Sequence, residues 1–179
     1  RFPHDAFGWK ALGAALVKSG KVDVALQPLQ QAVALAPQDI GALSNLGFAL
    51  QVRGHFVQSE VVLRLALRYQ PDFASALVNL GATMARCDRH EEAIECLERA
   101  LAIEPDCVPA LHQLAHAQEE RGFLVQALAT YQKVLDSADA GASIPRGAGS
   151  LASIAFAHLS ICSTLAKLSD FTQVVAHCD

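Results

Sequence analysis

A single pattern repeats along most of this 179-residue chain and constrains its fold more than any other feature. Four consecutive segments of 34 residues, 6–39, 40–73, 74–107 and 108–141, align with one another without gaps. A period of this length is typical of a small supersecondary unit that cannot bury its own apolar face and therefore stacks on its neighbours. The sequence thus predicts a row of similar units with mainly local contacts.

Small and large residues recur at fixed positions of the four segments. The seventh position is Leu12, Leu46, Leu80 and Leu114, the eighth is Gly13, Gly47, Gly81 and Ala115, and the twentieth is Ala25, Ser59, Ala93 and Ala127. Positions 4, 7, 8 and 11 fall on one face of a helix. Small residues at positions 8 and 20 allow two antiparallel helices to approach closely, so each segment is expected to form a helical hairpin.

Glycine and proline mark the ends of the expected helices. Gly20, Gly54 and Gly122 fall at the turn of their segments, and Arg89 is expected to occupy that turn in the third. Pro37, Pro71 and Pro105 end the second helix of the first three segments. Pro28 lies inside an expected helix, where we expect a kink without loss of the helix.

These columns resemble the tetratricopeptide repeat family over residues 6–141. The resemblance implies an all-α fold, an α-solenoid of stacked antiparallel helix hairpins wound into a right-handed superhelix. After the four units, 142–154 is rich in Ala, Gly and Ser and is expected to be an irregular insertion. Residues 155–179 are expected to form a partial fifth pair of helices, with Cys162 at its eighth position. A separate cap at 151–179 is the alternative.

Composition and charge exclude several classes of function. The net charge is −4 without a run of basic residues, so no nucleic-acid partner is expected. The most apolar stretch, 151–168, contains His158 and Lys167 and is expected to be a buried helix, so no membrane partner is predicted. The five cysteines form no CxxC pair, which favours a reducing compartment and a cytoplasmic location. Cys96, Cys162 and Cys178 are expected at helix-packing positions as unreactive thiols.

The resemblance also implies a ligand groove lined by the first helix of each unit. Its positions 2, 5, 6, 9, 12 and 13 face the concave side in the family, and the core of the repeat does not need them. The candidate groove residues in this chain are Phe7, Lys10, Asn45, Phe48, Gln51, Asn79, Arg86, His112, Gln113, His116, Glu119 and Glu120, together with Val78 and Ala82.

Position 6 of three successive units carries a carboxamide, in Asn45, Asn79 and Gln113. A carboxamide both donates and accepts hydrogen bonds, so it can hold a peptide backbone whatever the peptide's side chains. The row is similar to the asparagine ladder in the repeat arm of O-linked N-acetylglucosamine transferases. The alternative is that these amides only bridge neighbouring helices. The family's clamp for a C-terminal carboxylate is not expected, because only Lys10 and Asn45 match its five positions.

His112 and His116 have the spacing of a zinc-protease helix, one turn apart. The residue that would act as general base is Gln113, which cannot take a proton from water, and no third ligand motif follows. We therefore predict neither a catalytic metal nor any other cofactor. Ordinary groove-lining polar residues are the expected alternative.

Three functions remain, in decreasing order of support. The first is a non-catalytic scaffold that binds a peptide or partner protein in its groove, with association of copies through the terminal repeats left open. The second is the substrate-recruiting arm of a larger enzyme, because residues 2–10 resemble the start of repeat arms of bacterial glycosyltransferases. The third is a metal-dependent hydrolase, which Gln113 argues against.

Overall fold

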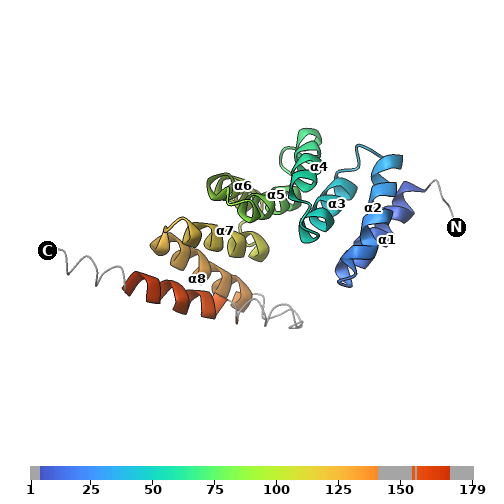
Figure 1. Ribbon diagram of the computed structural model, residues 1–179. Helices are drawn as coiled ribbons and strands as arrows, with labels where there is room; N and C mark the ends of the chain where they lie inside the picture. Colours follow the sequence, from blue (N-terminus) through green and yellow to red (C-terminus); the bar gives the residue numbers. More distant parts are fainter. Residues whose placement is uncertain (1–4, 141–154, 156, 170–179) are drawn as a thin grey trace. The chain divides into compact units, whose positions relative to one another are not determined.

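The computed structural model describes residues 5–140, 155 and 157–169, and every regular element among them is a helix (Figure 1). The helices are α1 (Ala6–Lys18), α2 (Val22–Leu35), α3 (Ile40–Val52), α4 (Phe56–Tyr69), α5 (Ala74–Arg86), α6 (His90–Ile103), α7 (Val108–Glu120) and α8 (Leu124–Ala140). A further helical segment spans 157–169. The chain is thus an all-α repeat solenoid, as predicted. The expected insertion at 142–154 and the second helix of a fifth pair lie outside the described residues.

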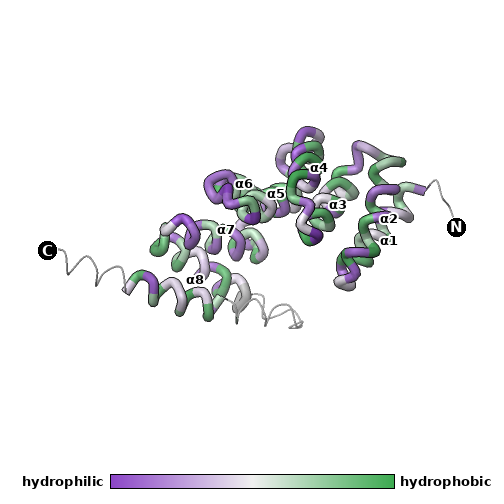
Figure 2. The backbone as a smooth tube through the Cα atoms, in the orientation of Figure 1, coloured by the Kyte–Doolittle hydropathy of each residue, from purple (hydrophilic) through white to green (hydrophobic). Residues whose placement is uncertain are grey.

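The chain divides into two units, residues 1–103 and 104–179. The first unit contains the hairpins α1–α2, α3–α4 and α5–α6, each an antiparallel pair whose two helices pack against one another. Successive hairpins pack through α2 on α3 and α4 on α5. Hydrophobic and hydrophilic residues alternate along these helices, as expected when one side of each helix is buried (Figure 2).

The small residues at position 8 allow the two helices of a hairpin to touch. A Cβ atom added to Gly13 would lie 2.5 Å from the Leu29 side chain, and one added to Gly47 would lie 2.5 Å from Leu63. At Gly81 the same atom would lie 2.7 Å from Leu97. Since real Cβ atoms do not approach this closely, the leucine at position 24 occupies the space that glycine leaves free.

The turn between paired helices requires a left-handed backbone. Gly20, Gly54 and Gly122 have φ of 76°, 77° and 78°. In the third hairpin the residue with positive φ is Asp88, at 59°. The sequence-based placement of Arg89 at this position was wrong by one residue. Aspartate tolerates the left-handed region better than most residues because its short polar side chain can bond locally.

Aspartate side chains cap the N-termini of two of the first helices. The Asp5 carboxylate accepts a hydrogen bond from the Phe7 amide at the start of α1, and Asp39 accepts one from Ala42 at the start of α3. Helix α2 continues through the buried Pro28, which confirms that the helix is kept, whereas the expected kink there stays a prediction. No helix in the described part of the chain is long and apolar enough to cross a membrane.

In the second unit, α7 and α8 form a hairpin against which the segment 157–169 packs. Ile161 lies against the core of Ala115, Ala127 and Tyr131. Ala157 and Thr164 are fully buried, and they occupy the third and tenth positions counted from residue 155. These are also the positions of Ala42 and Ala49 in α3, which are fully buried too. The two segments thus bury residues at matching positions, and a fifth pair of helices at 155–179 stays a prediction. The expectation that Cys162 lies at a helix-packing position was wrong, because its side chain is exposed, and Cys178 lies outside the described residues.

Candidate partner-binding surface

The first helices of the first unit lie side by side. Helix α3 packs against both α1 and α5, whereas no comparable packing joins α2 to α4 or α4 to α6 in the part of the chain that the structure describes. Besides the packing of each second helix on the next first helix, the first helices of successive hairpins therefore contact one another, whereas the described second helices do not pack in this way. We call the exposed side of α1, α3 and α5 the first-helix face. Its sequence-predicted members are Phe7, Lys10, Asn45, Phe48, Gln51, Asn79 and Arg86.

Lys10 is held by its own unit. Its Nζ lies 2.6 Å from Oδ2 of Asp39 and 5.7 Å from the centre of the Phe7 ring. Burial by itself would raise the pKa of Asp39, but hydrogen bonds from Lys10 and from the Ala42 amide outweigh it and lower that pKa. The carboxylate thus caps α3 and pairs with Lys10 at the same time. Phe7 is 71% exposed and remains open to a partner.

Asn45 provides the free hydrogen-bonding group of this face. Its side chain is half-buried, and its carboxamide has no hydrogen-bond partner among the described residues. Phe48 and Gln51 follow it on α3 and are also half-buried. This part of α3 therefore offers an amide, an aromatic ring and a second amide to an outside ligand.

Asn79 is partly committed inside the protein. Its Nδ2 donates to the hydroxyl oxygen of Ser44 at 3.2 Å and lies 3.4 Å from the Ser44 carbonyl oxygen, so it bridges α5 to α3. This geometry favours the helix-bridging alternative for the amino group of Asn79. Its Oδ1 accepts no hydrogen bond from the described residues, so the acceptor half of the amide stays available.

A buried hydroxyl network lies behind Asn79. Thr83 donates to the Asn79 carbonyl oxygen at 2.8 Å, and its hydroxyl lies 3.1 Å from that of Ser59. Ser59 in turn donates to the carbonyl oxygen of Gly47 at 2.8 Å. Ser59 and Thr83 are fully buried, and these bonds satisfy polar groups that would otherwise be costly to bury. The network fixes α5 against α3 and α4. Sequence reasoning missed it because Ser59 stands in a column defined only by small size.

Arg86 lies at the end of α5. Its guanidinium carbon is 5.8 Å from the centre of the Phe56 ring, a cation–π contact with the second helix of the preceding hairpin. The side chain is exposed, so its charge still faces solvent.

In the second unit, His112 packs against an aromatic ring. The ring centres of His112 and Tyr131 are 6.2 Å apart in an edge-on arrangement. Burial, and to a lesser degree the neighbouring His116, lowers the pKa of His112, so this ring is neutral near physiological pH. His116 is exposed and Gln113 is half-buried. Among the described residues no group of three or more His, Cys, Asp and Glu side chains could hold a metal ion.

Glu119 is the least exposed carboxylate of the predicted groove set, with 8% of its side chain exposed. It accepts hydrogen bonds from the Tyr131 hydroxyl at 3.1 Å and from Lys167 at 2.7 Å. Desolvation raises the pKa of Tyr131 to about 12 and Glu119 adds to that shift, whereas the bond to Glu119 raises the pKa of Lys167. Glu119 thus has two partners within its unit, while Glu120 is exposed. Neither partner was predicted, because Lys167 is distant in sequence and Tyr131 stands in a core column.

Comparison with known proteins supports this reading of the repeats. Residues 74–107, the third of the four segments, match the tetratricopeptide repeat family model. No curated relative matches the sequence.

The fold is similar to several solved structures. MamA shares 23% identity over 79% of this chain and 83% of its own, with a TM-score of 0.68. MamA 41-end from Desulfovibrio magneticus RS-1 shares 20% over 96% and 93%, with a TM-score of 0.64. YrrB, described as a TPR protein with an unusual peptide-binding site, shares 18% over 88% and 78%, with a TM-score of 0.61. The family match thus identifies residues 74–107 as a tetratricopeptide repeat, and the likeness to these structures shows that the chain has the fold of a tetratricopeptide-repeat solenoid.

Proposed function

We propose that this chain is a non-catalytic scaffold that holds an extended segment of a partner protein along the first-helix face of residues 6–103. The proposal rests mainly on Asn45, whose half-buried carboxamide is unpaired among the described residues and lies beside Phe48 on the same helix. A protein pays to desolvate an amide that it leaves unpaired, so such a group suits a ligand that brings its own donors and acceptors. A peptide backbone brings both.

The neighbouring residues suit the same ligand. The Oδ1 atom of Asn79 can accept from a backbone N–H, while Phe48 and Phe7 offer apolar area to side chains. The printed description of YrrB as peptide-binding shows that a related fold can carry such a site, although it does not locate the site in this chain. The alternative role as a substrate-recruiting arm of a transferase would use the same face, and the resemblance to such arms stays a prediction.

Photocrosslinking tests which side of the hairpins touches the partner. We would place a benzophenone amino acid at Phe48, on the first-helix face, or at Val57, which is 77% exposed on the second helix α4. The full chain that carries the benzophenone is expressed in the cells in which the protein naturally occurs. Its partner is then isolated from those cells by affinity capture and identified by mass spectrometry. We expect crosslinks from Phe48 and none from Val57, and the reverse pattern would refute the proposal.

A second measurement tests the role of the amide. Asn45→Ala removes one or two hydrogen bonds to the partner, each worth roughly 0.5–1.5 kcal/mol. Binding of the captured partner should weaken by roughly two-fold to a hundred-fold in titration calorimetry. Thermal stability should stay unchanged, because no described residue depends on the Asn45 side chain. Equal affinity for parent and variant would contradict the assigned role of Asn45.

A further inference from the structure

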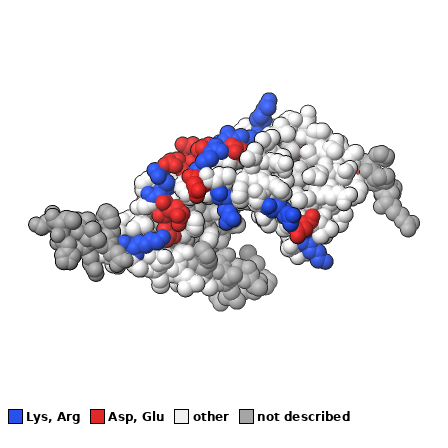
Figure 3. All heavy atoms as spheres, in the orientation of Figure 1, with Lys and Arg blue, Asp and Glu red and all other residues white. Residues whose placement is uncertain are grey.

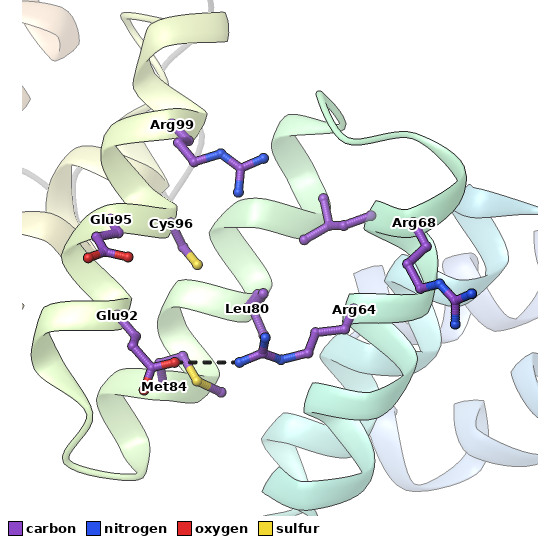
Figure 4. A pocket seen from close by; sticks show the side chains of 9 residues that line it. Arg64, Arg68, Leu80, Met84, Glu92, Glu95, Cys96 and Arg99 are labelled. Carbon is purple, nitrogen blue, oxygen red and sulfur yellow. Dashed lines mark hydrogen bonds and ion pairs between the residues drawn. The ribbon is translucent and has the colours of Figure 1, made fainter.

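A cavity of about 470 Å³ lies on the opposite side of the first unit, between α4 and α6 with α5 beneath it (Figure 4). Its origin is the hairpin stacking, because the first helices pack on one another whereas the second helices do not. Pockets that bind small ligands or anchor side chains measure about 300–1,000 Å³, so this space is large enough to hold part of a ligand. We call it the α4–α6 cavity.

The inner part of the α4–α6 cavity is apolar. Leu80 and Met84 of α5 line it and are 4% and 1% exposed, and Leu67 of α4 joins them. The thiol of Cys96 on α6 completes this surface. Desolvation raises the pKa of Cys96 despite the nearby Arg99 and Arg64, so the thiol is uncharged at neutral pH. An aliphatic side chain would find matching contacts here.

The walls of the cavity carry arginines from both helices. Figure 4 shows Arg64 of α4 and Arg99 of α6 reaching toward the space between the helices from opposite sides, whereas the side chain of Arg68, at the edge of the cavity on α4, points away from that space. The same view shows Glu95 pointing away from that space. An anionic group that enters the cavity would therefore meet positive charge on both walls.

Not all of this charge is available. Arg64 and Arg89 both pair with Glu60, at 2.8 and 2.9 Å, and Arg89 also pairs with Glu92 at 2.6 Å. The Arg64–Glu92 distance is 3.5 Å, so these four residues form a network of two positive and two negative charges that neutralises itself. Positive and negative side chains are accordingly seen side by side over this region (Figure 3).

Arg68 and Arg99 remain outside that network. Among the described residues Arg68 has no ion-pair partner, and Arg99 donates only to the carbonyl oxygen of Pro71, at 3.2 Å. A guanidinium has five N–H donors in a planar fork, so most of those on Arg99 are unused. The cavity thus has one unpaired positive charge directed toward its apolar interior, that of Arg99, and a second at its edge, that of Arg68, in a chain whose net charge is −4.

We infer that the α4–α6 cavity binds an acidic segment of a partner protein, with an aliphatic side chain against Leu80 and Met84 and an adjacent Asp or Glu on Arg99, next to Arg68 at the edge of the cavity. A carboxylate suits the site better than a phosphate group, because Glu95 also lines it outside the ion-pair network and repels a dianion about twice as strongly as a monoanion. The site lies on second helices and does not depend on the binding proposed for the first-helix face.

A random peptide library displayed on phage provides the test. The library is selected in parallel against the full parent chain and against the double variant Arg68→Gln/Arg99→Gln. We expect sequences with Asp or Glu next to Leu, Ile, Val or Met to be enriched on the parent and lost on the double variant. A synthetic peptide of that sequence should slow alkylation of Cys96 by N-ethylmaleimide, followed by mass spectrometry, without slowing alkylation of Cys107.

A matched variant separates this site from general charge. Lys18→Gln removes one exposed positive charge elsewhere in the same unit and should leave peptide affinity unchanged. The double variant should lower affinity at least about ten-fold, since each charge-assisted hydrogen bond is worth roughly 1.5–3 kcal/mol.

Three results would overturn the inference. The first is that selection on the parent chain enriches no peptides with an acidic residue next to an aliphatic one. The second is that the selected peptide binds the parent and the double variant with the same affinity. The third is protection of Cys96 by inorganic phosphate as effective as that by the peptide, which would indicate a general anion site.

Discussion

The first and third hairpins have the same residue columns and nearly the same internal packing, yet they differ in what they bury. Leu12 of α1 and Leu80 of α5 both occupy position 7, but Leu12 is 47% exposed and Leu80 is 4% exposed. Helix α5, which carries Leu80, packs against the preceding helix α4, whereas no described residue precedes α1 in that way. Gly13 and Gly81, by contrast, contact the leucine of their own hairpin equally closely. The residue type at a repeat position therefore determines the contacts within a hairpin, whereas the contacts between hairpins depend on whether another hairpin packs on that side.

The largest expected effect separates the two leucines. Leu80→Ala should lower the free energy of unfolding by roughly 2–5 kcal/mol, because it leaves a cavity between α5 and α4. Leu12→Ala should cost about 1 kcal/mol or less, since nearly half of that side chain already faces solvent. Urea unfolding followed by far-ultraviolet circular dichroism measures both. Equal losses would mean that position 7 is stabilised within its own hairpin.

The second prediction is that replacing the position-8 glycine should lower stability equally in the first and third hairpins. Gly13→Ala and Gly81→Ala both introduce a methyl group into space filled by Leu29 or Leu97, and overpacking of this kind costs roughly 1–3 kcal/mol. Alanine gains about 1 kcal/mol in helix propensity, which offsets part of that loss. Destabilisation of one hairpin alone, seen in native-state hydrogen exchange, would break the equivalence of their internal packing.

A smaller effect concerns the turn of the third hairpin, where Asp88 replaces the glycine of the others. Asp88→Gly should stabilise the chain by up to about 1 kcal/mol, because glycine enters the left-handed region without strain. The converse change, Gly54→Asp, should destabilise by a similar amount. Thermal unfolding of both variants checks the pair, and stabilisation by Gly54→Asp would refute the backbone argument.

The smallest effect concerns the link between the first two hairpins and depends on pH. Asp39→Asn keeps a good helix cap but removes the charge that pairs with Lys10, so it should cost below about 1 kcal/mol near pH 7. Because the folded-state pKa of Asp39 is lowered, this contribution is present above the pKa of the unfolded state, and it disappears as the pH falls through the folded value. The parent and Asp39→Asn chains should therefore converge in stability in acid. A difference that persists there would assign the effect to the cap instead.

Much of the fold follows from the sequence because a hairpin is a local structure. The spacing of Leu46, Gly47 and Ser59 specifies two helices that must touch, and each first helix begins at the first residue of its repeated segment, as at Ile40 and Ala74. The turn glycines follow from backbone sterics in the same way. The error at Arg89 was one of position, since the glycine column of the ungapped alignment, 34 residues after Gly54, falls on Asp88.

Only the tertiary structure decided which polar side chains of those helices are free. Asn45 and Asn79 are equivalent in sequence, but Ser44 satisfies the amino group of Asn79 and no described residue does so for Asn45. Likewise, Glu119 pairs with Lys167, which lies 48 residues further along the chain. The α4–α6 cavity, too, depends on how two second helices are spaced. Sequence periodicity records contacts that recur in every repeat, whereas pairing between repeats depends on the particular residues that stacking brings together.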